Sequence, residues 1–463
     1  MKISRYLTKK EIIILGISTI LMSLCFCFVE DLRHTVECSL AFLEGHFSDF
    51  YDYNIYDKGM PTIVYYPTIY LIYAIWNIPL KLLGIQTISK NAPAIMFYEK
   101  LLGFLFLALL YYFVYKLSLL ILKEKKKALN SLFVLFTLPI FFLYEFPWEL
   151  YDSVWCAFLI MGIYFLLKNT KNTTLIAIVC FAICTTCKTF VLFVILPILF
   201  YRFKNILHLA LAGIGCLSLY GLQTILFSNS EYFVNNVISP LDGGFFINAV
   251  WGMSIQNISI LLVIFILICI HAYRNDNNNI MFYIYYPFIS GAIFYGIAQE
   301  TPNWIYIFIP FYAILISNLG KKDRTFFYLL NMVLSIACLG FVMSTRGFAY
   351  GESTFGAGML GRLLFGVSNA YDTVLVHSEQ FFTKLLYRAD YTKYFDTVIF
   401  SVLLYAIYYL NPSNIQKKEI VLTDSQFIEK DERKIAYICL GIPIMFYLLP
   451  VLAWVAQNQT LFG

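Results

Sequence analysis

The stretch EIIILGISTILMSLCFCFVEDLRHTVE, residues 11–37, changes character at one point, where a long apolar run ends and two adjacent acids, Glu30 and Asp31, begin. A transmembrane helix needs about 20 predominantly apolar residues, and the run 11–29 is long enough. A short basic segment precedes the run, as in a signal peptide, but no small-residue cleavage site follows it. We therefore interpret residues 11–29 as a retained first span, with both acids at the membrane boundary.

Composition assigns the whole chain to the membrane proteins. Of its 463 residues, 60% are hydrophobic and only 13% are charged, and the mean hydropathy is +0.72. A soluble globular domain carries roughly 25% charged residues. The predicted fold class is therefore an all-α polytopic membrane protein, which excludes the ordinary soluble classes.

Basic residues recur in short loops between the apolar segments, which is typical of cytoplasmic loops. These clusters are Lys123 to Lys127, Lys168 with Lys171, Arg202 with Lys204, Arg274, Lys321 to Arg324 and Lys417 to Lys434. All of them lie on the cytoplasmic side only if the apolar segment 67–84 does not cross the membrane. Pro67 and Pro79 bound an uninterrupted helix of about a dozen residues there, whereas a span needs roughly 20. We therefore expect an external helix that does not span.

The resulting map has about thirteen transmembrane helices, with the N-terminus in the cytoplasm and the C-terminus outside. The predicted spans are 11–29, 94–122, 128–146, 153–168, 173–187, 189–201, 206–227, 256–273, 280–298, 305–319, 325–344, 394–411 and 434–455. The main external features are a first loop at 30–93, a short loop at 147–153, a turn at Lys188 and a long loop at 345–393. The protein is thus expected to be an integral plasma-membrane protein of multi-pass topology.

The first external loop begins with an amphipathic pattern. Apolar residues recur at helical spacing, at Leu32, Val36, Leu40, Leu43 and Phe47. We expect this helix to lie on the membrane surface, with Glu30 and Asp31 at the water boundary. From the residues alone, two interpretations stay open: a solvated helix face with i,i+4 ion pairs, or an acidic catalytic site.

Four external motifs, in this order along the chain, are similar to those of one enzyme family. They are EDLRHTVECSLAFLEGHFSDFYDYN (30–54), in which a helix ends in a glycine, YYPTIYLIYAIWNIPLKLLG (65–84), PWELYDS (147–153) and CKTFVLFVILP (187–197). Over roughly the first 210 residues and parts of the 280–320 region, the chain resembles the GT-C superfamily of glycosyltransferases, in particular bacterial mannosyltransferase-like multi-pass enzymes. The resemblance implies transfer of a monosaccharide from a polyprenyl-phosphate carrier to an acceptor glycan or lipid on the external face. It also implies a catalytic module over 1–227 and a variable C-terminal module over 228–463.

The resemblance assigns a role to an acid and a lysine. Asp31 takes the place of the base that deprotonates the acceptor hydroxyl, and Glu30 is the substitute for it. Lys188 is an external cation with no acidic neighbour in sequence, and it takes the place of the ligand for the donor phosphate. A lysine that extends to the interface by snorkelling is the alternative interpretation of Lys188.

Further external residues belong to the same implied site. Glu149 and Asp152 occupy the position of a second acidic motif that binds donor, acceptor or a divalent metal, although their spacing is not a tight Asp-x-Asp. Tyr65 and Tyr66 would shape the sugar pocket, while an interfacial aromatic belt is the ordinary alternative. The motifs identify no definite cofactor, and a divalent metal at the acidic motif is left open.

Two rival classes share parts of this pattern. A lipid-linked polysaccharide polymerase would also have many spans and external chemistry on lipid carriers, with larger, Arg-rich external loops. A lipid or solute transporter would show inverted repeats with broken helices, and no internal repeat is visible. The expected partners are the polyprenyl-phosphate sugar, the acceptor and the bilayer, with no nucleic acid.

Overall fold

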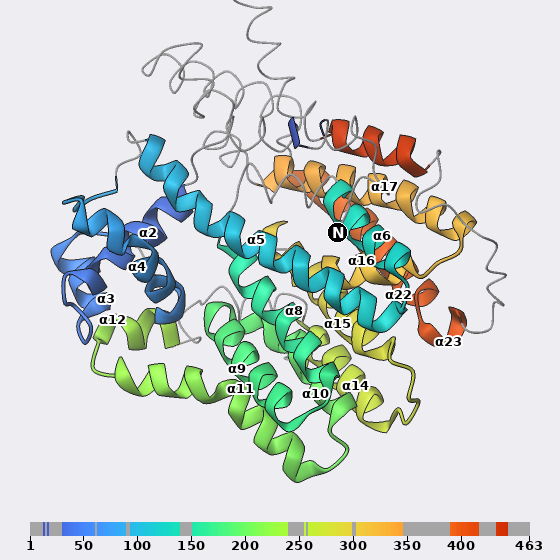
Figure 1. Cartoon of the computed structure of the whole chain (residues 1–463), viewed down its shortest axis with the longest axis horizontal. Helices are drawn as coiled ribbons and strands as arrows, with labels where there is room; N and C mark the ends of the chain where they lie inside the picture. Colours follow the sequence, from blue (N-terminus) through green and yellow to red (C-terminus); the bar gives the residue numbers. More distant parts are fainter. Residues whose placement is uncertain are drawn as a thin grey trace, which may run out of the picture.

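A computed structural model of the chain describes residues 13, 16–17, 30–60, 63–88, 93–138, 151–238, 254–255, 258–298, 302–345, 389–415 and 432–442. These residues are mostly helical (Figure 1), as the sequence predicts. The main helices are α2 (Glu30–Leu43), α4 (Pro67–Leu82), α5 (Pro93–Leu122), α6 (Lys125–Thr137), α8 (Asp152–Lys168), α9 (Lys171–Cys187), α10 (Leu192–Arg202), α11 (Ile206–Leu226), α14 (Ile260–Arg274), α15 (Phe282–Ala298), α16 (Ile309–Ser317), α17 (Lys321–Thr345) and α22 (Ala389–Tyr409).

Short elements complete the described part of the chain. They are α3 (Phe50–Asp52), α12 (Glu231–Phe233), α23 (Pro412–Ile415), single turns at Tyr53–Asp57, Thr189–Val191, Val234–Ile238 and Pro302–Ile307, a helical segment at 432–442, and the antiparallel strands β1 (Ser254–Ile255) and β2 (Ile258–Ser259). Strands are thus almost absent from the residues that the structure describes, in agreement with the all-α prediction.

Three of the described helices are long and apolar enough to cross a membrane: Ala94–Leu122, Ile206–Leu226 and Lys321–Phe341. Shorter apolar helices are Lys171–Cys187, Thr189–Arg202, Ile260–Arg274 and Phe282–Ala298. These helices indicate association with a membrane, at a coarser level than the thirteen predicted spans. The first predicted span (11–29) and the long loop (345–393) lie almost wholly outside the described residues.

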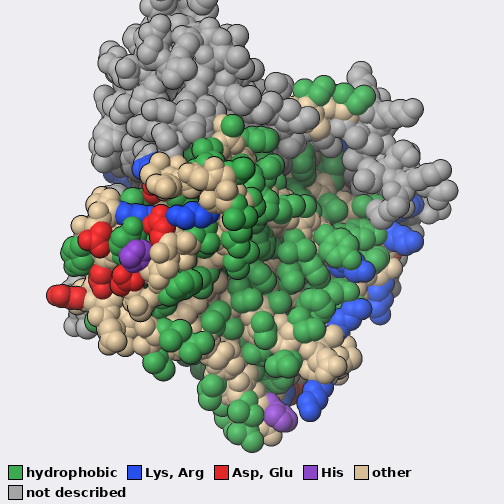
Figure 2. All heavy atoms as spheres, turned by 60° about the vertical axis from the view of Figure 1, so that its left-hand side comes forward, with side chains coloured by type: hydrophobic (Ala, Val, Ile, Leu, Met, Phe, Trp, Pro, Cys, Tyr) green, Lys and Arg blue, Asp and Glu red, His purple; other side chains and the backbone are tan. Residues whose placement is uncertain are grey.

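The surface of α11 shows why such a helix suits a lipid environment. Leu211, Ile214 and Ile225 are 56%, 66% and 73% exposed. Removing an apolar side chain of this size from water is favourable by roughly 1.5–3 kcal/mol. A row of exposed apolar side chains is therefore more stable in contact with lipid than in contact with water. Figure 2 shows hydrophobic side chains spread widely over this face of the molecule, with acidic side chains gathered at the left and further basic side chains along the right and lower edges.

The amphipathic stripe of α2 packs on protein, which corrects the expectation that it lies on the membrane. Leu32, Val36 and Leu40 are at most 1% exposed and belong to the core that α2 forms with α4. Phe47, the last residue of the predicted stripe, lies beyond the helix and is 61% exposed. Apolar side chains also point outward on α4, where Ile75 is 68% and Leu82 is 82% exposed. Leaving water stabilises an apolar stripe equally whether it contacts lipid or protein. Here the stripe of α2 contacts α4.

The ends of α2 and α4 follow local chemistry. As the motif predicts, a glycine follows the end of α2: Gly45 has φ +96°, and the next amide, His46 N, donates to Ala41 O at 3.0 Å. Pro79 does not end α4, which continues to Leu82. Pro79 has no N–H to donate to the carbonyl four residues earlier, but its own carbonyl accepts from Leu83 N at 3.1 Å and the last turn stays helical. With 16 residues, α4 is still shorter than a span.

Two helices of equal length, α8 and α9, form an antiparallel hairpin with 17 residues in each arm. Asn169 adopts a left-handed conformation (φ 56°) after α8, and Thr170 caps α9 through a reciprocal capping box with Thr173. Equal arms and a tight turn place the first residue of α8, Asp152, opposite the residue after α9, Lys188.

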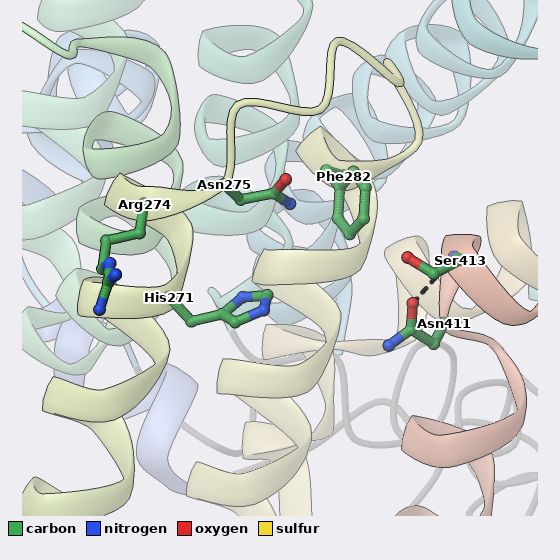
Figure 3. Close-up of a pocket in the computed structure, with 6 residues that line it drawn as sticks. All are labelled: His271, Arg274, Asn275, Phe282, Asn411 and Ser413. Atoms are coloured by element: carbon green, nitrogen blue, oxygen red, sulfur yellow. Dashed lines mark hydrogen bonds between the residues drawn. The ribbon is translucent and has the colours of Figure 1, made fainter.

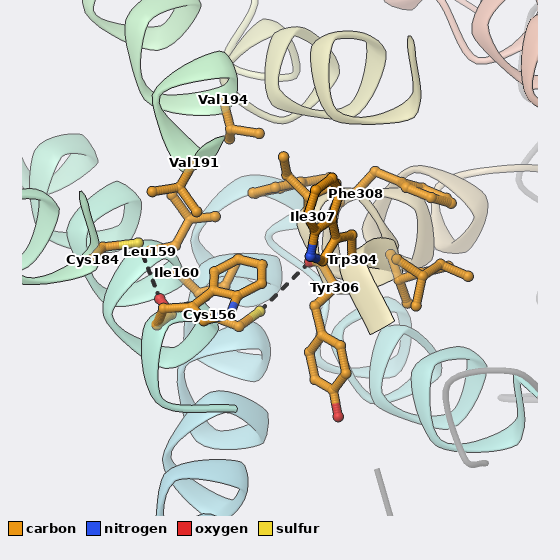
Figure 4. Packing of buried hydrophobic residues seen from close by; sticks show 14 of the residues in the cluster. Cys156, Leu159, Ile160, Cys184, Val191, Val194, Trp304, Tyr306, Ile307 and Phe308 are labelled. Atoms are coloured by element: carbon orange, nitrogen blue, oxygen red, sulfur yellow. Dashed lines mark hydrogen bonds between the residues drawn. The ribbon is translucent and has the colours of Figure 1, made fainter. Parts of the chain in front are cut away.

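A close-packed core supports that end of the hairpin. Figure 4 shows Cys156 and Cys184 of the hairpin beside Val191 and the segment Trp304–Phe308. The Cys184 thiol donates to Trp155 O at 3.2 Å, and the Cys156 thiol contacts Tyr306 O at 3.7 Å. Close-packed interiors have low compressibility, so these buried contacts support the residues at the end of the hairpin.

Candidate functional site

Four side chains meet at the open end of the α8–α9 hairpin, and three of them belong to the predicted site. The Lys188 ammonium lies 3.9 Å from Asp152 Oδ1 and donates to the Tyr65 hydroxyl at 3.3 Å. It also lies 4.3 Å from the ring centre of Tyr65 and 5.0 Å from that of Tyr151. We call Tyr65, Tyr151, Asp152 and Lys188 the hairpin-end cluster.

Burial makes this cluster electrostatically strong. Lys188 is 8% and Asp152 is 1% exposed. Charges removed from water interact several-fold more strongly than at a surface, and aromatic faces add attraction for a cation. The predicted cation at this turn, Lys188, is therefore paired with Asp152, an acid that is distant from it in sequence.

Asp152 is held in place by its own helix. The indole N–H of Trp155, one turn further along α8, donates to Asp152 Oδ1 at 2.5 Å. The Trp155 ring packs edge-on against Phe190 with 5.5 Å between ring centres. The carboxylate therefore has a defined orientation toward Lys188, set by a residue that follows it in the PWELYDSVW segment.

Hydrogen bonds tie the loop that carries Tyr65 to the hairpin and to α11. The Thr68 hydroxyl at the start of α4 donates to Thr186 Oγ1 at 2.8 Å. Gln223 Nε2 of α11 donates to Thr68 Oγ1 at 2.6 Å. All three residues are buried, and Thr186 stands two residues before Lys188. These two hydrogen bonds hold the start of α4 against the hairpin, and so position Tyr65 near the Lys188 ammonium.

Tyr66, the neighbouring predicted pocket residue, belongs to a different contact set. Its hydroxyl lies 3.3 Å from Thr224 Oγ1, and its ring stacks on Tyr220 at 4.3 Å. Burial raises the pKa of Tyr66 above its usual range, although the Thr224 hydrogen bond acts in the opposite direction. The structure therefore places Tyr65 in the cluster and directs Tyr66 toward α11.

The predicted catalytic acids lie at the start of α2. Glu30 and Asp31 form the first turn of α2, and their side chains lie outside the described residues, as does the whole of Glu149. Further along α2, Glu37 Oε2 accepts a hydrogen bond from Ile88 N at 2.7 Å. Burial raises the pKa of Glu37, against the lowering effect of that bond and of Arg33. Glu37 thus fastens the segment after α4 to α2.

A metal at the acidic motif stays an open prediction, because Glu149, one of its two acids, lies outside the described residues. No group of three or more His, Cys, Asp or Glu residues is placed to hold a metal among them. Asp152 Oδ1 already accepts the Trp155 N–H and faces the Lys188 cation. A lysine at that distance opposes a second cation, whereas a hard divalent metal requires several oxygen ligands.

A second buried polar set lies between α2, α4 and α5. Glu99 and Lys100 on α5 are 0% and 1% exposed. The Asn77 amide, with its nitrogen toward Glu99, lies 2.7 Å and 3.1 Å from the two carboxylate oxygens. Trp76 and Tyr98 stack beside this contact at 5.0 Å. The sequence shows the charged residues of α5 but does not show that the Asn77 amide contacts Glu99.

The residues that sequence reasoning missed are Tyr151 and Trp155. Both flank Asp152 within one helical turn, so their proximity to any acid-based site could have been read from the spacing. Their role as ring and N–H partners depends on the side-chain directions.

No protein-family model, no curated protein and no solved structure matches this chain.

Proposed function

We propose that the chain is a membrane glycosyltransferase that moves a monosaccharide from a polyprenyl-phosphate carrier to an acceptor glycan or lipid. The observation that carries this proposal is the hairpin-end cluster, in which a buried ammonium, Lys188, is oriented by Asp152 and the Tyr65 hydroxyl. The likeness of the four motifs to GT-C glycosyltransferases supports the same conclusion.

The chemistry of the leaving group explains why a cation is needed. As the bond between the anomeric carbon and the phosphate oxygen breaks, its electron pair passes to the phosphate, whose negative charge increases. A preorganised cation at a poorly hydrated site stabilises that developing charge, and removing one such donor typically costs about 10²–10³-fold in rate. Lys188 would supply the charge, and Tyr65 would supply a hydroxyl beside it.

Asp31 would act on the other substrate. As the acceptor oxygen bonds to the anomeric carbon, the acceptor hydroxyl proton passes to the Asp31 carboxylate. Glu30 is adjacent in the first turn of α2 and is the substitute base. Bond formation, bond cleavage and proton transfer then balance without a further reactant, and the products are the glycosylated acceptor and the polyprenyl phosphate.

The proposed orientation places this chemistry outside the cell. Lys168 and Lys171 lie at the turn of the α8–α9 hairpin, and Lys188 lies at its open end. Since basic clusters mark cytoplasmic loops, the open end would face outward. The same rule supports the thirteen-span arrangement with a cytoplasmic N-terminus and an external C-terminus.

A donor assay with matched variants tests the proposal. Full-length protein is incubated with acceptor membranes and radiolabelled polyprenyl-monophosphate sugars, or with diphosphate-linked oligosaccharides. Transfer from the monophosphate donor is expected, with about 10²–10⁴-fold loss in Asp31→Asn. Glu30→Gln is compared directly, and Asp49→Asn, a carboxylate paired with His46 in the same loop, is the control.

Three results would contradict parts of the proposal. Near-normal transfer by Asp31→Asn would remove that residue as the base, and loss in Glu30→Gln alone would move the base to Glu30. Activity restricted to diphosphate-linked oligosaccharides would favour a polysaccharide polymerase.

A further inference from the structure

A small cavity lies at the opposite end of the helices from the hairpin-end cluster. Its volume is about 190 Å³, and its lining residues are His271, Arg274, Asn275, Phe282, Asn411 and Ser413. Figure 3 shows His271 and Asn275 from the end of α14 directed toward the space that Asn411 and Ser413 border from the α22–α23 connection. Five of these side chains can donate hydrogen bonds, Phe282 forms an apolar wall, and none of the six is acidic.

A hydrogen-bond chain orients the donors on the α14 side. Asn275 Nδ2 donates to the Tyr286 hydroxyl at 2.8 Å, and that hydroxyl lies 2.9 Å from His271 Nδ1. When the hydroxyl donates to Nδ1, the imidazole carries its proton on Nε2. An anion in the cavity would select this tautomer or the imidazolium, and each has a donor at Nε2.

The end of α14 would ordinarily repel an anion, because a helix C-terminus carries partial negative charge. Lys204 offsets it: its ammonium donates to the carbonyl oxygens of Ala272, Tyr273 and Asn275 at 3.0, 2.7 and 2.9 Å. Asp276 follows in the same loop but does not line the cavity. Arg274 and a protonated His271 contribute positive charge near the cavity, while Asp276 interacts with Lys204 in the same loop and contributes negative charge.

The same face of α14 is apolar directly beyond the cavity. Leu267, Ile270, His271 and Arg274 recur at spacings of three, one and three, which is one face of a helix. Leu267 and Ile270 are 58% and 48% exposed. Figure 3 shows the Arg274 side chain along the outer side of α14, so it contacts a ligand beside His271 only after a change of rotamer. Such a ligand meets an exposed apolar surface that continues along the helix.

We infer that this cavity binds the phosphate of an anionic membrane lipid, with an acyl chain along Leu267 and Ile270. Pockets for complete drug-sized ligands measure roughly 300–1,000 Å³, so the cavity suits a head group whose remainder lies outside it. Basic pockets between membrane helices on the cytoplasmic side are a recurrent form of such recognition. The inference does not depend on the proposed transferase activity.

Binding to the purified full-length protein in a neutral detergent tests the inference. Phosphatidic acid, phosphatidylcholine, diacylglycerol, glycerol phosphate and inorganic phosphate are titrated separately, with native mass spectrometry and thermal shift as readouts. Phosphatidic acid is expected to bind at least about 10-fold more tightly than each other probe. Arg274→Gln and His271→Gln should each weaken it about 10-fold, the effect of losing one charge-assisted hydrogen bond.

The matched control is Lys322→Gln, which removes an exposed charge from the first turn of α17 outside the cavity. It should change the affinity by less than about twofold. An equal loss in Lys322→Gln and Arg274→Gln would reveal general charge attraction and overturn the inference. Equal binding of glycerol phosphate and phosphatidic acid would overturn the lipid assignment in favour of a soluble anion, and equal binding of phosphatidylcholine or diacylglycerol would overturn selectivity for an anion.

Discussion

The Lys188 ammonium and Asp152 Oδ1 lie 3.9 Å apart, and neither side chain is more than 8% exposed. Such a pair has two possible roles with different signatures. It can hold the two ends of the hairpin together, or it can keep a cation charged and oriented for a phosphate. A buried pair is weak evidence for stability, because desolvation offsets much of the attraction. Variants that separate folding from donor binding are therefore informative.

Lys188→Met is expected to lower the free energy of unfolding by about 3 kcal/mol, because it removes the cation from a buried carboxylate. Lys188→Met combined with Asp152→Asn should recover most of that loss, since no charge of the pair then remains. Sugar transfer should stay low in both variants, because neither has the cation. Thermal unfolding and a donor-transfer assay provide the two measurements. Recovery of transfer in the double variant would show that the pair is structural only.

Thr68→Val is expected to loosen the contact between the Tyr65 loop and the hairpin. Valine has nearly the same shape but cannot accept from Gln223 or donate to Thr186, and an unsatisfied buried donor costs about 1–3 kcal/mol. The apparent melting temperature should fall accordingly. Thr397→Val is the control, since its hydroxyl bonds only to its own helix at Lys393 O and is exposed. Equal shifts in the two variants would contradict a role for the network.

The stability of the α2–α4 region should depend on pH through Glu44. Burial raises the pKa of this carboxyl, but the Lys58 ammonium at 2.8 Å and the Lys81 ammonium at 3.4 Å lower it by a larger amount. The net pKa is therefore below 4.5. A carboxyl whose pKa is lower in the folded state than in the unfolded state stabilises the fold when the pH is above its unfolded-state pKa. This contribution is lost as the pH falls through the folded-state pKa.

The measurement for Glu44 is a difference between two proteins. The unmutated chain should melt above Glu44→Gln at pH 7, by an amount that corresponds to about 0.5–1 kcal/mol for a partly exposed pair. That difference should shrink when the pH is lowered below 4.5, the ordinary pKa of the group. A difference that stays constant from neutral to acidic pH would assign the effect to shape instead of charge.

A bidentate ion pair joins α17 to the helical segment 432–442. Arg324 Nε and Nη2 donate to the two Glu432 oxygens at 2.8 and 3.1 Å, and both residues are buried. Glu432→Gln should therefore lower the free energy of unfolding by about 3 kcal/mol, and Arg324→Lys should not preserve the forked geometry. Thermal unfolding measures both, with Lys322→Gln as a neutral reference. Unchanged melting in Glu432→Gln would refute this contribution.

Labelling from each side of intact cells tests the proposed topology. Tyr56→Cys, at a position 66% exposed in the first loop, should react with an impermeant maleimide added outside. Lys125→Cys should react only after the membrane is opened, because it belongs to a basic cluster. The native background should be low, since the nine cysteines in the described part of the chain are all buried. External labelling at Lys125 would invert the orientation and the site built on it.

Local features could be predicted from the sequence because their causes are local. Apolar length identifies helices that suit a membrane, and the glycine at position 45 marks the end of α2. The positions of Asp152 and Lys188 at matching ends of α8 and α9 follow from the lengths of two apolar segments and the turn between them. The proximity of the two residues could thus be predicted from the sequence.

Tertiary packing decided the rest. The stripe Leu32, Val36 and Leu40 faces α4 because an apolar surface gains from protein as it does from lipid, so periodicity alone does not select the partner. Tyr65 reaches Lys188 across 123 residues, while its neighbour Tyr66 turns toward α11. The cavity between the ends of α14 and α22 is likewise formed by residues that are distant in sequence, such as His271 and Asn411. Side chains distant in sequence meet only when helices pack, and no local pattern encodes which faces come together.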